Sequence, residues 1–170
     1  MAINLEIKIK TRSHKGYIEI LNSIGAEYFG ILYQKDIYFK VPSGLLKLRI
    51  ENDKYTLIRY ARHEMGKRWS NYELLKLEAV HPEGKNPEKF MTGLLKTKAI
   101  VKKKRIFYLY NNTRIHLDVV KGLGKYLELE TLLVTDKKDA AIRFREMLSL
   151  LRINPVKQIH SSYKNLIRNK

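Results

Sequence analysis

The sequence lacks cysteine, and its 170 residues contain no apolar run long enough to cross a bilayer. The absence of cysteine excludes disulfide bonds, zinc–thiolate sites and a cysteine nucleophile, and it favours a cytoplasmic location. The N-terminus leads directly into an alternating charged segment, so we expect no secretory signal peptide and no membrane partner. Because internal repeats, low-complexity tracts and linker-like stretches are also absent, we expect a single domain over residues 1–170.

Acidic residues are scarce relative to basic ones. The chain has 17 Asp and Glu against 34 Lys and Arg, which gives a formal net charge of +17. Such a charge attracts anions, including nucleic acid, nucleotides and polyphosphate. Long charged side chains usually face water, so the scattered lysines are expected at the surface. These lysines are Lys15, Lys85, Lys89, Lys96, Lys98 and Lys170.

The segment Leu5–Lys10 alternates strictly between aliphatic and charged residues. A β-strand points successive side chains to opposite faces, so Glu6, Lys8 and Lys10 share one face and the aliphatic residues share the other. Similar alternation returns in three later segments, and two of the four bring carboxylates to the polar face while the others bring cations. The later segments are 45–50, 101–105 and 126–130.

The remaining patterns predict about eight strands and four helices. Strands are expected over 3–11, 28–41, 45–50, 54–62, 68–80, 99–110, 113–120 and 125–134. Helices are expected over 13–24 and from Asn86, Asp136 and Asn154. In the last helix the inward residues are expected to be Val156, Ile159, Tyr163 and Leu166. Consecutive strands joined by short turns are antiparallel, and a sheet of this size tends to curl or close, so the pattern predicts an α+β fold.

The polar faces of these strands can point either to solvent or to an enclosed interior. For any single strand a solvated face is the ordinary arrangement. For the whole set, the apolar stripes of the helices must cover the aliphatic face of the sheet, which leaves the charged faces for a concave interior. Charged side chains in such an interior would have to be paired with opposite charges or bind a charged ligand. The residues that would meet there are Glu6, Glu128, Glu130, Lys8, Lys47, Arg49, Lys103, Arg105 and Arg114.

Such an interior suits a metal-bound polyphosphate. Mg²⁺ binds carboxylate oxygens and shares phosphate oxygens with its substrate, so a few glutamates are enough to hold it. Lysine and arginine neutralise the remaining phosphate charge, and arginine can bind two oxygens at once. Phosphoryl transfer needs mainly in-line positioning and charge neutralisation, so no protein nucleophile is required.

The ordered set of motifs resembles the CYTH-domain family, the triphosphate tunnel metalloenzymes, over nearly the whole chain. The family's first-strand signature, Glu-x-Glu-x-Lys, is matched by Asn4-Leu5-Glu6-Ile7-Lys8. Residues 34–39 and 44–49 resemble its second and third strands, and residues 68–72 resemble its Arg-Ser-Asp-Tyr segment. Three segments resemble its C-terminal signature: His116-Leu117-Asp118, Gly122-Leu123-Gly124 and Glu128-Leu129-Glu130. The pair Ser162-Tyr163 resembles a pair in the last helix of the family's cyclase-like branch.

The resemblance implies an eight-stranded antiparallel β-barrel, the tunnel, with helices packed on the outside. It implies that Glu6, Glu128 and Glu130 hold Mg²⁺ or Mn²⁺, and that the catalytic residues are Lys8, Asp118 and Arg105. A triphosphate would be bound by Lys8, Lys10, Lys47, Arg49, Arg62, Lys103, Arg105 and Arg114. Members of the family often form dimers, so a homodimer is a further expectation.

Two positions depart from the family pattern. Asn4 stands in place of the first glutamate of the signature, which keeps a carbonyl oxygen but removes a charge that would favour a metal. Leu45 stands where a common branch of the family has arginine, which removes one cation from the tunnel mouth. Both changes are compatible with a different substrate or a weaker enzyme.

Histidine offers one further candidate. His116 shares the inward face with Arg114 and Asp118, where it is either a proton relay or a hydrogen-bonded structural residue. The other histidines show no metal-ligand spacing, so structural or surface roles are expected for them. They are His14, His63, His81 and His160.

Two classes of function remain open. The first is an enzyme acting on a triphosphate, either class IV adenylyl cyclase-like, converting ATP to cyclic AMP and pyrophosphate, or a hydrolase of thiamine triphosphate, tripolyphosphate or a nucleoside triphosphate. The resemblance leans to the cyclase-like branch, whereas hydrolysis is the more generic activity. The second is a non-catalytic basic barrel that binds RNA or polyphosphate, with steep salt dependence and no metal requirement. We expect a small-molecule triphosphate, rather than nucleic acid, to be the partner.

Overall fold

The computed structural model describes residues 2–60, 69–77 and 86–168 of the chain. Within these residues it has eight β-strands, four α-helices and one short 3₁₀ turn. The strands are β1 (Ala2–Thr11), β2 (Glu27–Phe39), β3 (Leu45–Glu51), β4 (Lys54–Tyr60), β5 (Trp69–Leu77), β6 (Thr97–Tyr110), β7 (Thr113–Val120) and β8 (Gly124–Leu132). The helices are α1 (Lys15–Ser23), α2 (Pro87–Leu94), α3 (Lys137–Leu150) and α4 (Tyr163–Arg168), and the 3₁₀ turn η1 spans Pro155–Lys157.

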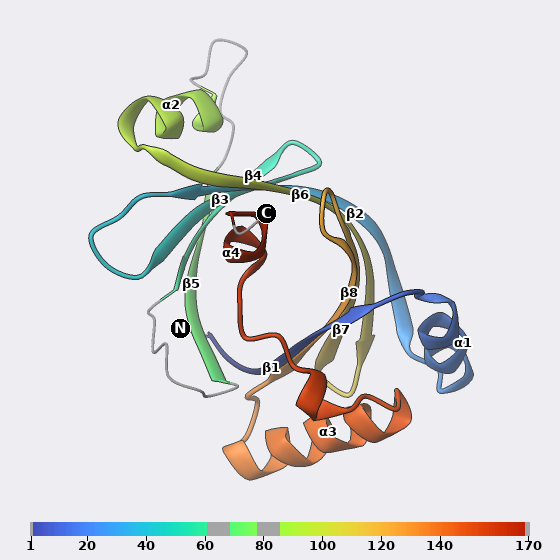
Figure 1. Ribbon diagram of the computed structural model, residues 1–170. Coiled ribbons are helices and arrows are strands. Elements are labelled where there is room, and N and C mark those ends of the chain that lie inside the picture. Colours follow the sequence, from blue (N-terminus) through green and yellow to red (C-terminus); the bar gives the residue numbers. More distant parts are fainter. Residues whose placement is uncertain (1, 61–68, 78–85, 169–170) are drawn as a thin grey trace.

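The strands close into a barrel in the order β1-β5-β4-β3-β2-β6-β7-β8. Every neighbouring pair is antiparallel. Figure 1 shows the strands as a ring, with α1, α2 and α3 outside it. The predicted α+β fold with an eight-stranded antiparallel barrel is therefore confirmed.

Two of the tight turns depend on residues that tolerate a left-handed backbone. Asn52 and Asp53 join β3 to β4 with φ values of 47° and 60°, and Asn111 and Asn112 join β6 to β7 with φ values of 43° and 54°. Asparagine and aspartate adopt this region more readily than other residues with a side chain, and such turns match the twist of antiparallel strands. These short connections help to fix the register between neighbouring strands.

The register places charged positions of adjacent strands side by side. Glu6 on β1 lies opposite Glu130 on β8, and Arg105 on β6 lies opposite Asp118 on β7. Residues directly opposite each other in an antiparallel pair share a face of the sheet. We call the interior of the barrel, onto which these four residues face, the lumen.

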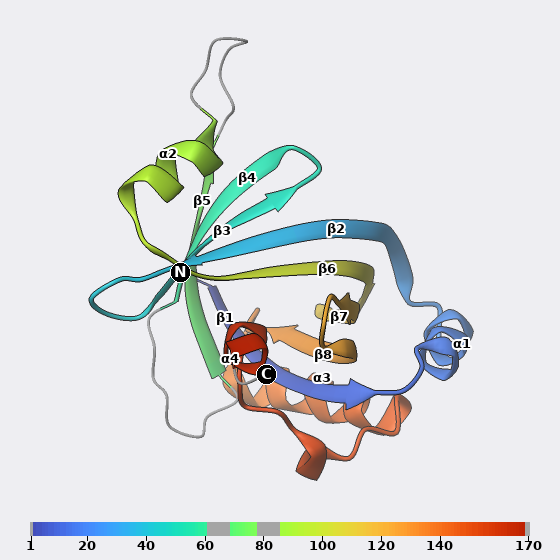
Figure 2. The same cartoon turned by 45° about the horizontal axis from the view of Figure 1, so that its top comes forward.

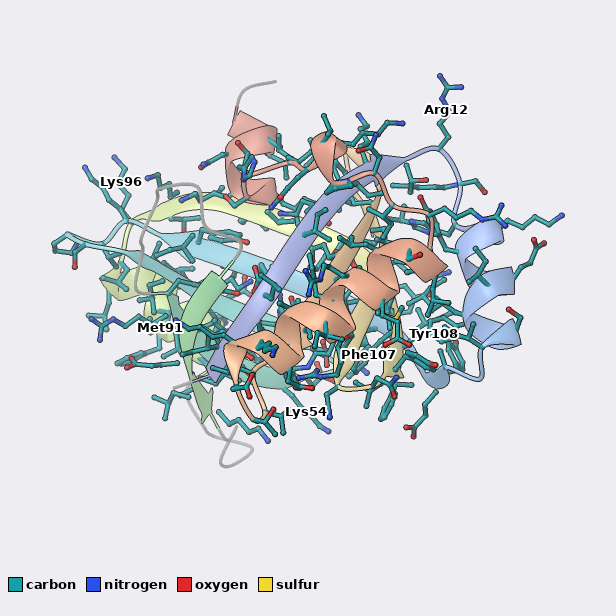
Figure 3. The ribbon with its side chains drawn as sticks, turned by 90° about the horizontal axis from the view of Figure 1, so that it is seen from below. Arg12, Lys54, Met91, Lys96, Phe107 and Tyr108 are labelled. Carbon is teal, nitrogen blue, oxygen red and sulfur yellow. The ribbon has the colours of Figure 1, made fainter. Side chains whose placement is uncertain are left out.

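The aliphatic faces of the strands lie outside the barrel under three helices. Helices α1 and α3 cover a cluster that includes Ile7, Leu129 and Phe144, and Figure 3 shows α3 lying across β1. Helix α2 covers a second cluster, in which Met91 packs against Leu48 and its neighbours. Burial of these side chains is worth roughly 1.5–3 kcal/mol each, so the helices stabilise the outer wall. No helix in the described part of the chain has the length and apolar character needed to span a membrane.

The predicted starts of α2 and α3 are confirmed by their capping residues. The Asn86 side chain accepts hydrogen bonds from the backbone N–H groups of Glu88 and Lys89, at 2.9 and 3.3 Å. The Asp136 side chain accepts one from the backbone N–H of Asp139, at 2.8 Å. Both caps satisfy amide groups that have no partner within the helix itself.

The C-terminal segment differs from the predicted last helix. Residues Pro155–Lys157 form only a 3₁₀ turn, and Val156, which we expected to face inward, is 88 % exposed. That part of the prediction was wrong because the Asn154 side chain closes the turn and the Ile159 N–H then pairs with the backbone of β1. Helix α4 follows and lies within the ring of strands in Figure 1, unlike the other three helices. Figure 2 shows the same helix close to β1.

Candidate active site

The first ionic cluster joins β2 to β3 in the lumen. Asp36, which is 2 % exposed, accepts hydrogen bonds from Lys47 Nζ at 3.0 Å and from Arg49 Nε and Nη2 at 2.7 and 2.8 Å. Burial alone would raise the pKa of Asp36, but Arg49 and Lys47 hold it well below its ordinary value. Burial lowers the pKa of Lys47 to about 8. The ionised carboxylate therefore fixes two cations side by side.

A second cluster is built around Asp118 on β7. Its carboxylate is fully buried and accepts hydrogen bonds from Lys103 Nζ at 3.3 Å and from Arg105 Nε and Nη2, both at 2.7 Å. The Tyr163 hydroxyl of α4 donates a further bond at 3.0 Å. Burial opposes ionisation, but Arg105 and Lys103 hold the pKa of Asp118 far below its ordinary value. Asp118 is thus an anion whose donors leave it little capacity to take up a proton.

Glu128 on β8 continues this network toward β1. Its Oε1 lies 3.2 Å from Lys8 Nζ, and its Oε2 lies 2.6 Å from Arg105 Nη2. Burial would raise the pKa of Glu128, but Lys8 and Arg105 lower it to about 2. Arg105 consequently bridges Glu128 and Asp118, because a guanidinium group presents several N–H donors in a fixed plane.

Glu130 faces an arginine and a histidine. Its Oε2 lies 3.5 Å from Arg114 Nη1, and its Oε1 lies 3.6 Å from His116 Nδ1, which is also 4.0 Å from Glu128 Oε2. Burial and the charge of Arg105 lower the pKa of His116 to about 4, so its imidazole is neutral at pH 7. One ligand atom each from His116, Glu128 and Glu130 lie within 4.8 Å of one another. A single divalent ion can bridge groups at this spacing.

Glu6 adds a third glutamate to the same side of the lumen. It is half-buried on β1, opposite Glu130 in the register. Burial raises the pKa of the Tyr60 phenol, and the charges of Glu6 and Glu130 raise it further. Tyr60 is therefore a neutral hydroxyl close to both carboxylates.

The separate clusters act electrostatically as one site. The charge of Lys103 lowers the pKa values of Asp36 and Lys47 in the neighbouring cluster, and Arg105 acts in the same way on Arg49. Six cations thus stand against five carboxylates, which leaves this set with a net charge of +1. The set comprises Lys8, Lys47, Arg49, Lys103, Arg105 and Arg114 with Glu6, Asp36, Asp118, Glu128 and Glu130.

The segment before and within α4 contacts this site from one end of the barrel. Lys8 Nζ donates a hydrogen bond to the Ser161 carbonyl oxygen at 3.2 Å and lies 4.4 Å from the centre of the Tyr163 ring. Lys103 Nζ lies 5.1 Å from the same ring. A cation over an aromatic face is attracted by the ring quadrupole. Tyr163 therefore touches two cations and one carboxylate of the site.

Most of the described residues proposed from the sequence are brought together, and Lys10 is not. Lys10 is exposed near the end of β1, with its Nζ 6.0 Å from the Tyr126 ring centre. Arg62 lies outside the described residues. Arg59 on β4 pairs with Glu73 on the outer face, where both side chains are more than half exposed. Figure 3 shows Arg12 and Lys96 pointing away from the barrel, so part of the basic surface is separate from the lumen.

Sequence reasoning missed the roles of Asp36 and Tyr163 in this network. Asp36 lies in a segment rich in aromatic residues, but Gln34, Asp36 and Tyr38 are at alternate positions, and that period could have identified it. Tyr163 was assigned to the inward face of the last helix and to a match with the cyclase-like branch, but its contact with Asp118 was not predicted, because no local pattern reveals a contact with a strand 45 residues earlier. His116 was weighed as a proton relay or a structural residue, and its approach to Glu130 depends on the pairing of β7 with β8.

Comparisons with known proteins agree with this architecture. A family model described as the CYTH domain matches residues 2–163. A Methanocaldococcus jannaschii protein named "Putative adenylate cyclase MJ0240" is 25 % identical over 173 residues, which cover 96 % of this chain and 98 % of the relative. The solved structure of PH1012 protein from Pyrococcus horikoshii has a TM-score of 0.78 at 24 % identity, over 96 % of this chain and 98 % of that one.

A plant structure shares the fold at lower identity. HpAC1 from Hippeastrum, which is described as a "putative adenylyl cyclase" with "a dominant triphophatase activity", has a TM-score of 0.69 at 14 % identity. The match covers 99 % of this chain and 96 % of HpAC1. These two structural likenesses concern the arrangement of strands and helices rather than the reaction.

Proposed function

The chain belongs to the CYTH domain family, and from this membership we propose that it is a metal-dependent enzyme acting on a triphosphate held in the barrel lumen. The observation that carries the proposal is the mixed lumen itself. Glu128 and Glu130 on β8 lie at metal-ligand spacing from His116 on β7, while Arg105 and Lys103 lie on β6, the other neighbour of β7. A metal polyphosphate needs both halves of this arrangement, carboxylates for the ion and cations for the phosphates.

The three lumen glutamates are the proposed holders of Mg²⁺ or Mn²⁺. Glu6, Glu128 and Glu130 supply hard oxygen donors from two paired strands, and the grouping of Glu128 and Glu130 with His116 supports the fit. A bound divalent ion would neutralise phosphate oxygens and orient the chain of phosphates. The neutral hydroxyl of Tyr60 lies close to two of these carboxylates and offers a hydrogen-bond donor in the same region.

The lumen cations are the proposed triphosphate ligands. Among the described residues, six lumen cations are each paired with a carboxylate, so a polyanion would share cations that are already oriented. Arg105 and Arg49 suit bidentate contact with phosphate oxygens because hydrogen bonds to Asp118 and Asp36 fix the planes of their guanidinium groups. The six cations are Lys8, Lys47, Arg49, Lys103, Arg105 and Arg114. The expected contributions of Lys10 and Arg62 stay predictions from the sequence.

Catalytic roles follow from these contacts. We assign Lys8 and Arg105 to the charge that develops on the reacting phosphate, since both reach the proposed metal ligand Glu128. Asp118 is assigned a positioning role, because its oxygens are occupied by Lys103, Arg105 and Tyr163 and its pKa is far too low for a general base.

Two reactions fit this site. In the cyclase reaction the ribose 3′-oxygen attacks the α-phosphorus of ATP, loses its proton and releases pyrophosphate. In the hydrolase reaction water attacks the γ-phosphorus, loses a proton and displaces the diphosphate part of the substrate, so that the γ-phosphoryl group is released as phosphate. The name of the Methanocaldococcus jannaschii relative supports the first, and the described activity of HpAC1 supports the second.

The alternative is a barrel that binds RNA or polyphosphate without turnover. The formal net charge of +17 favours it. This alternative predicts binding that needs no metal and no lumen carboxylate. Metal-dependent turnover therefore distinguishes the enzyme from the binding protein.

The test is a substrate panel of ATP, thiamine triphosphate and tripolyphosphate with Mg²⁺ or Mn²⁺, with phosphate, pyrophosphate and cyclic AMP measured as products. We expect metal-dependent turnover that falls by about 10²-fold or more in Glu130→Gln, since electrostatic stabilisation of the transition state is lost. The matched control is Glu73→Gln, which removes an exposed carboxylate on the outer face and should leave turnover unchanged. Full activity in both Glu128→Gln and Glu130→Gln would exclude the proposed metal site.

A further inference from the structure

His116 presents an unpaired nitrogen to the lumen carboxylates. Its side chain is 5 % exposed, and Nδ1 has no hydrogen-bond partner among the described residues. Glu130 Oε1 lies 3.6 Å from Nδ1, and Glu128 Oε2 lies 4.0 Å from it. Both distances are too long for a hydrogen bond, yet they are those expected of groups that surround a shared ion.

A buried polar atom without a partner is costly to the folded state, so its persistence calls for an explanation. The imidazole ring is held in place by Phe107, whose ring centre lies 5.3 Å away in an edge-on arrangement, and Phe107 is labelled in Figure 3. The register of β7 and β8 sets His116 directly opposite Glu128. The nitrogen is therefore directed to the carboxylates by packing and strand pairing.

The two glutamates are not equally available to an ion. Both oxygens of Glu128 are in short contact with cations, at 3.2 Å from Lys8 and 2.6 Å from Arg105. Glu130 has looser neighbours, with Arg114 at 3.5 Å from one oxygen and His116 at 3.6 Å from the other. Glu130 is thus held less tightly by cations than Glu128, and together with His116 it offers one oxygen and one nitrogen donor.

We propose that His116 Nδ1 is a direct ligand of the lumen ion, together with Glu130 and Glu128, and that this nitrogen makes the site select a first-row transition ion over Mg²⁺. The proposal rests on the proposed function only in that a divalent ion occupies the lumen. Mg²⁺ is a hard ion that binds oxygen and keeps its waters. Imidazole nitrogen favours first-row transition ions, and the affinity of a nitrogen-containing site is weakest for Mn²⁺ and rises through Co²⁺. A site made only of glutamates would lack this discrimination.

A second buried polar group lies near the same carboxylates and is consistent with an ion there. Asn4 is 1 % exposed, precedes Glu6 by two residues on β1, and has no hydrogen-bond partner at either amide atom within the described chain. Its amide oxygen is a possible further ligand, but it is a hard donor that does not discriminate against Mg²⁺. The proposed selectivity therefore depends on the nitrogen of His116.

The direct test detects nitrogen coordination without any turnover. Metal-free full-length protein is loaded with Mn²⁺ in the absence of substrate, and pulsed electron paramagnetic resonance measures nitrogen coupling to the ion. We expect a ¹⁴N coupling that changes to the ¹⁵N pattern when the protein is labelled with ¹⁵N-histidine. Absence of nitrogen coupling in the unmodified protein would overturn the proposal, and this readout does not depend on any variant folding.

Calorimetric titration of Mg²⁺, Mn²⁺ and Co²⁺ into the same protein measures the selectivity. In His116→Asn we expect Mn²⁺ and Co²⁺ to bind at least about tenfold more weakly, because the loss of a residue that only supports a metal ligand already lowers metal affinity by about that factor. The affinity for Mg²⁺ should change by less than about threefold. The control is His160→Asn, which removes an exposed imidazole and should leave all three affinities unchanged. Equal weakening for Mg²⁺ and the transition ions in His116→Asn would overturn the proposal.

The proposed function and the proposed His116 ligand can be refuted independently. Nitrogen-coordinated Mn²⁺ without turnover of any triphosphate would refute the proposed function and leave the His116 ligand intact. Metal-dependent turnover with no nitrogen coupling would refute the His116 ligand and leave the proposed function intact.

Discussion

Asp118 holds three side chains of the site in place at once. It is fully buried and holds Lys103, Arg105 and Tyr163 through hydrogen bonds of 2.7–3.3 Å. Removing one partner of a buried ion pair leaves an uncompensated charge, which costs more than the intact pair contributes. The same carboxylate therefore determines both the stability of the lumen and the orientation of the cations proposed to bind phosphate.

We expect Asp118→Asn to lower the free energy of unfolding by about 3–5 kcal/mol, because Arg105 and Lys103 lose their shared anion in a buried position. Guanidinium denaturation at pH 7 measures the change. The control is Asp53→Asn, in the exposed turn between β3 and β4, where the φ value of 60° suits asparagine. The control should stay within about 0.5 kcal/mol of the unmodified protein, and an equal loss in both variants would contradict the role of the buried cluster.

The pH dependence of stability follows from Glu128. Its folded pKa is about 2, against an ordinary value of 4.5, because Lys8 and Arg105 outweigh the effect of burial. A carboxylate with a lowered folded pKa contributes stability that is present above its unfolded pKa and is lost as the pH falls through the folded pKa. We therefore expect Tm to fall between about pH 5 and about pH 2, and Glu128→Gln to reduce that slope. Calorimetric scans at constant ionic strength measure Tm at each pH. Equal slopes of Tm against pH in the unmodified protein and in Glu128→Gln would contradict the lowered pKa of Glu128.

At the scale of elements, alternation in the sequence was sufficient to locate the strands but not to pair them. The period of two in Leu5–Lys10 shows which side chains share a face, yet it carries no information about the neighbouring strand. The pairings that close the barrel, β1 with β5 and β2 with β6, join segments far apart in the sequence. From residues alone we could predict only a sheet that curls or closes, and the eight-stranded barrel came from the family resemblance.

The C-terminal segment and the site show where local patterns were insufficient. The spacing of Val156, Ile159, Tyr163 and Leu166 suits a helix, but the buried bond between Tyr163 and Asp118 requires a chain that turns before α4. The glutamates and most cations could be predicted because they lie on alternating strands. The proximity of His116 to Glu130 could not, because it arises from the register between β7 and β8.

The turn that precedes β3 gives a prediction at this scale. Gly44 has a φ value of 71°, and a Cβ atom there would lie 2.7 Å from the Tyr60 carbonyl oxygen. Gly44→Ala should therefore destabilise the protein by more than about 1 kcal/mol, since both backbone strain and a clash with fixed backbone act against it. Chemical denaturation measures the loss.

The matched control for Gly44→Ala is Gly16→Ala. Gly16 lies in the first turn of α1, where an added Cβ meets no atom within 4 Å. Alanine is the better helix former, so this variant should be unchanged or more stable by about 0.5 kcal/mol. If both alanine variants had the same stability, the strained contact at Tyr60 would not exist in solution.

At the scale of the whole molecule, the net charge of the chain and that of the lumen differ. The chain carries +17, whereas the six cations and five carboxylates of the lumen set amount to +1. Most of the positive excess therefore lies away from this set. Anions attracted by the excess and a triphosphate bound in the lumen should respond differently to salt and metal, because exposed charges are screened more strongly than buried ones.

This difference leads to a prediction about how metal and triphosphate bind together. A divalent ion changes the lumen set from +1 to +3, which better matches a triphosphate chain with about four negative charges. We expect tripolyphosphate with Mn²⁺ to raise Tm more than tripolyphosphate alone, and the additional rise to persist from about 50 to about 500 mM KCl. In Glu130→Gln the additional rise should disappear while the metal-independent rise remains, and RNA should stabilise the protein only at low salt. Identical shifts with and without Mn²⁺, unchanged in Glu130→Gln, would mean that the barrel binds polyanions through its cations alone and that the glutamates do not hold a metal.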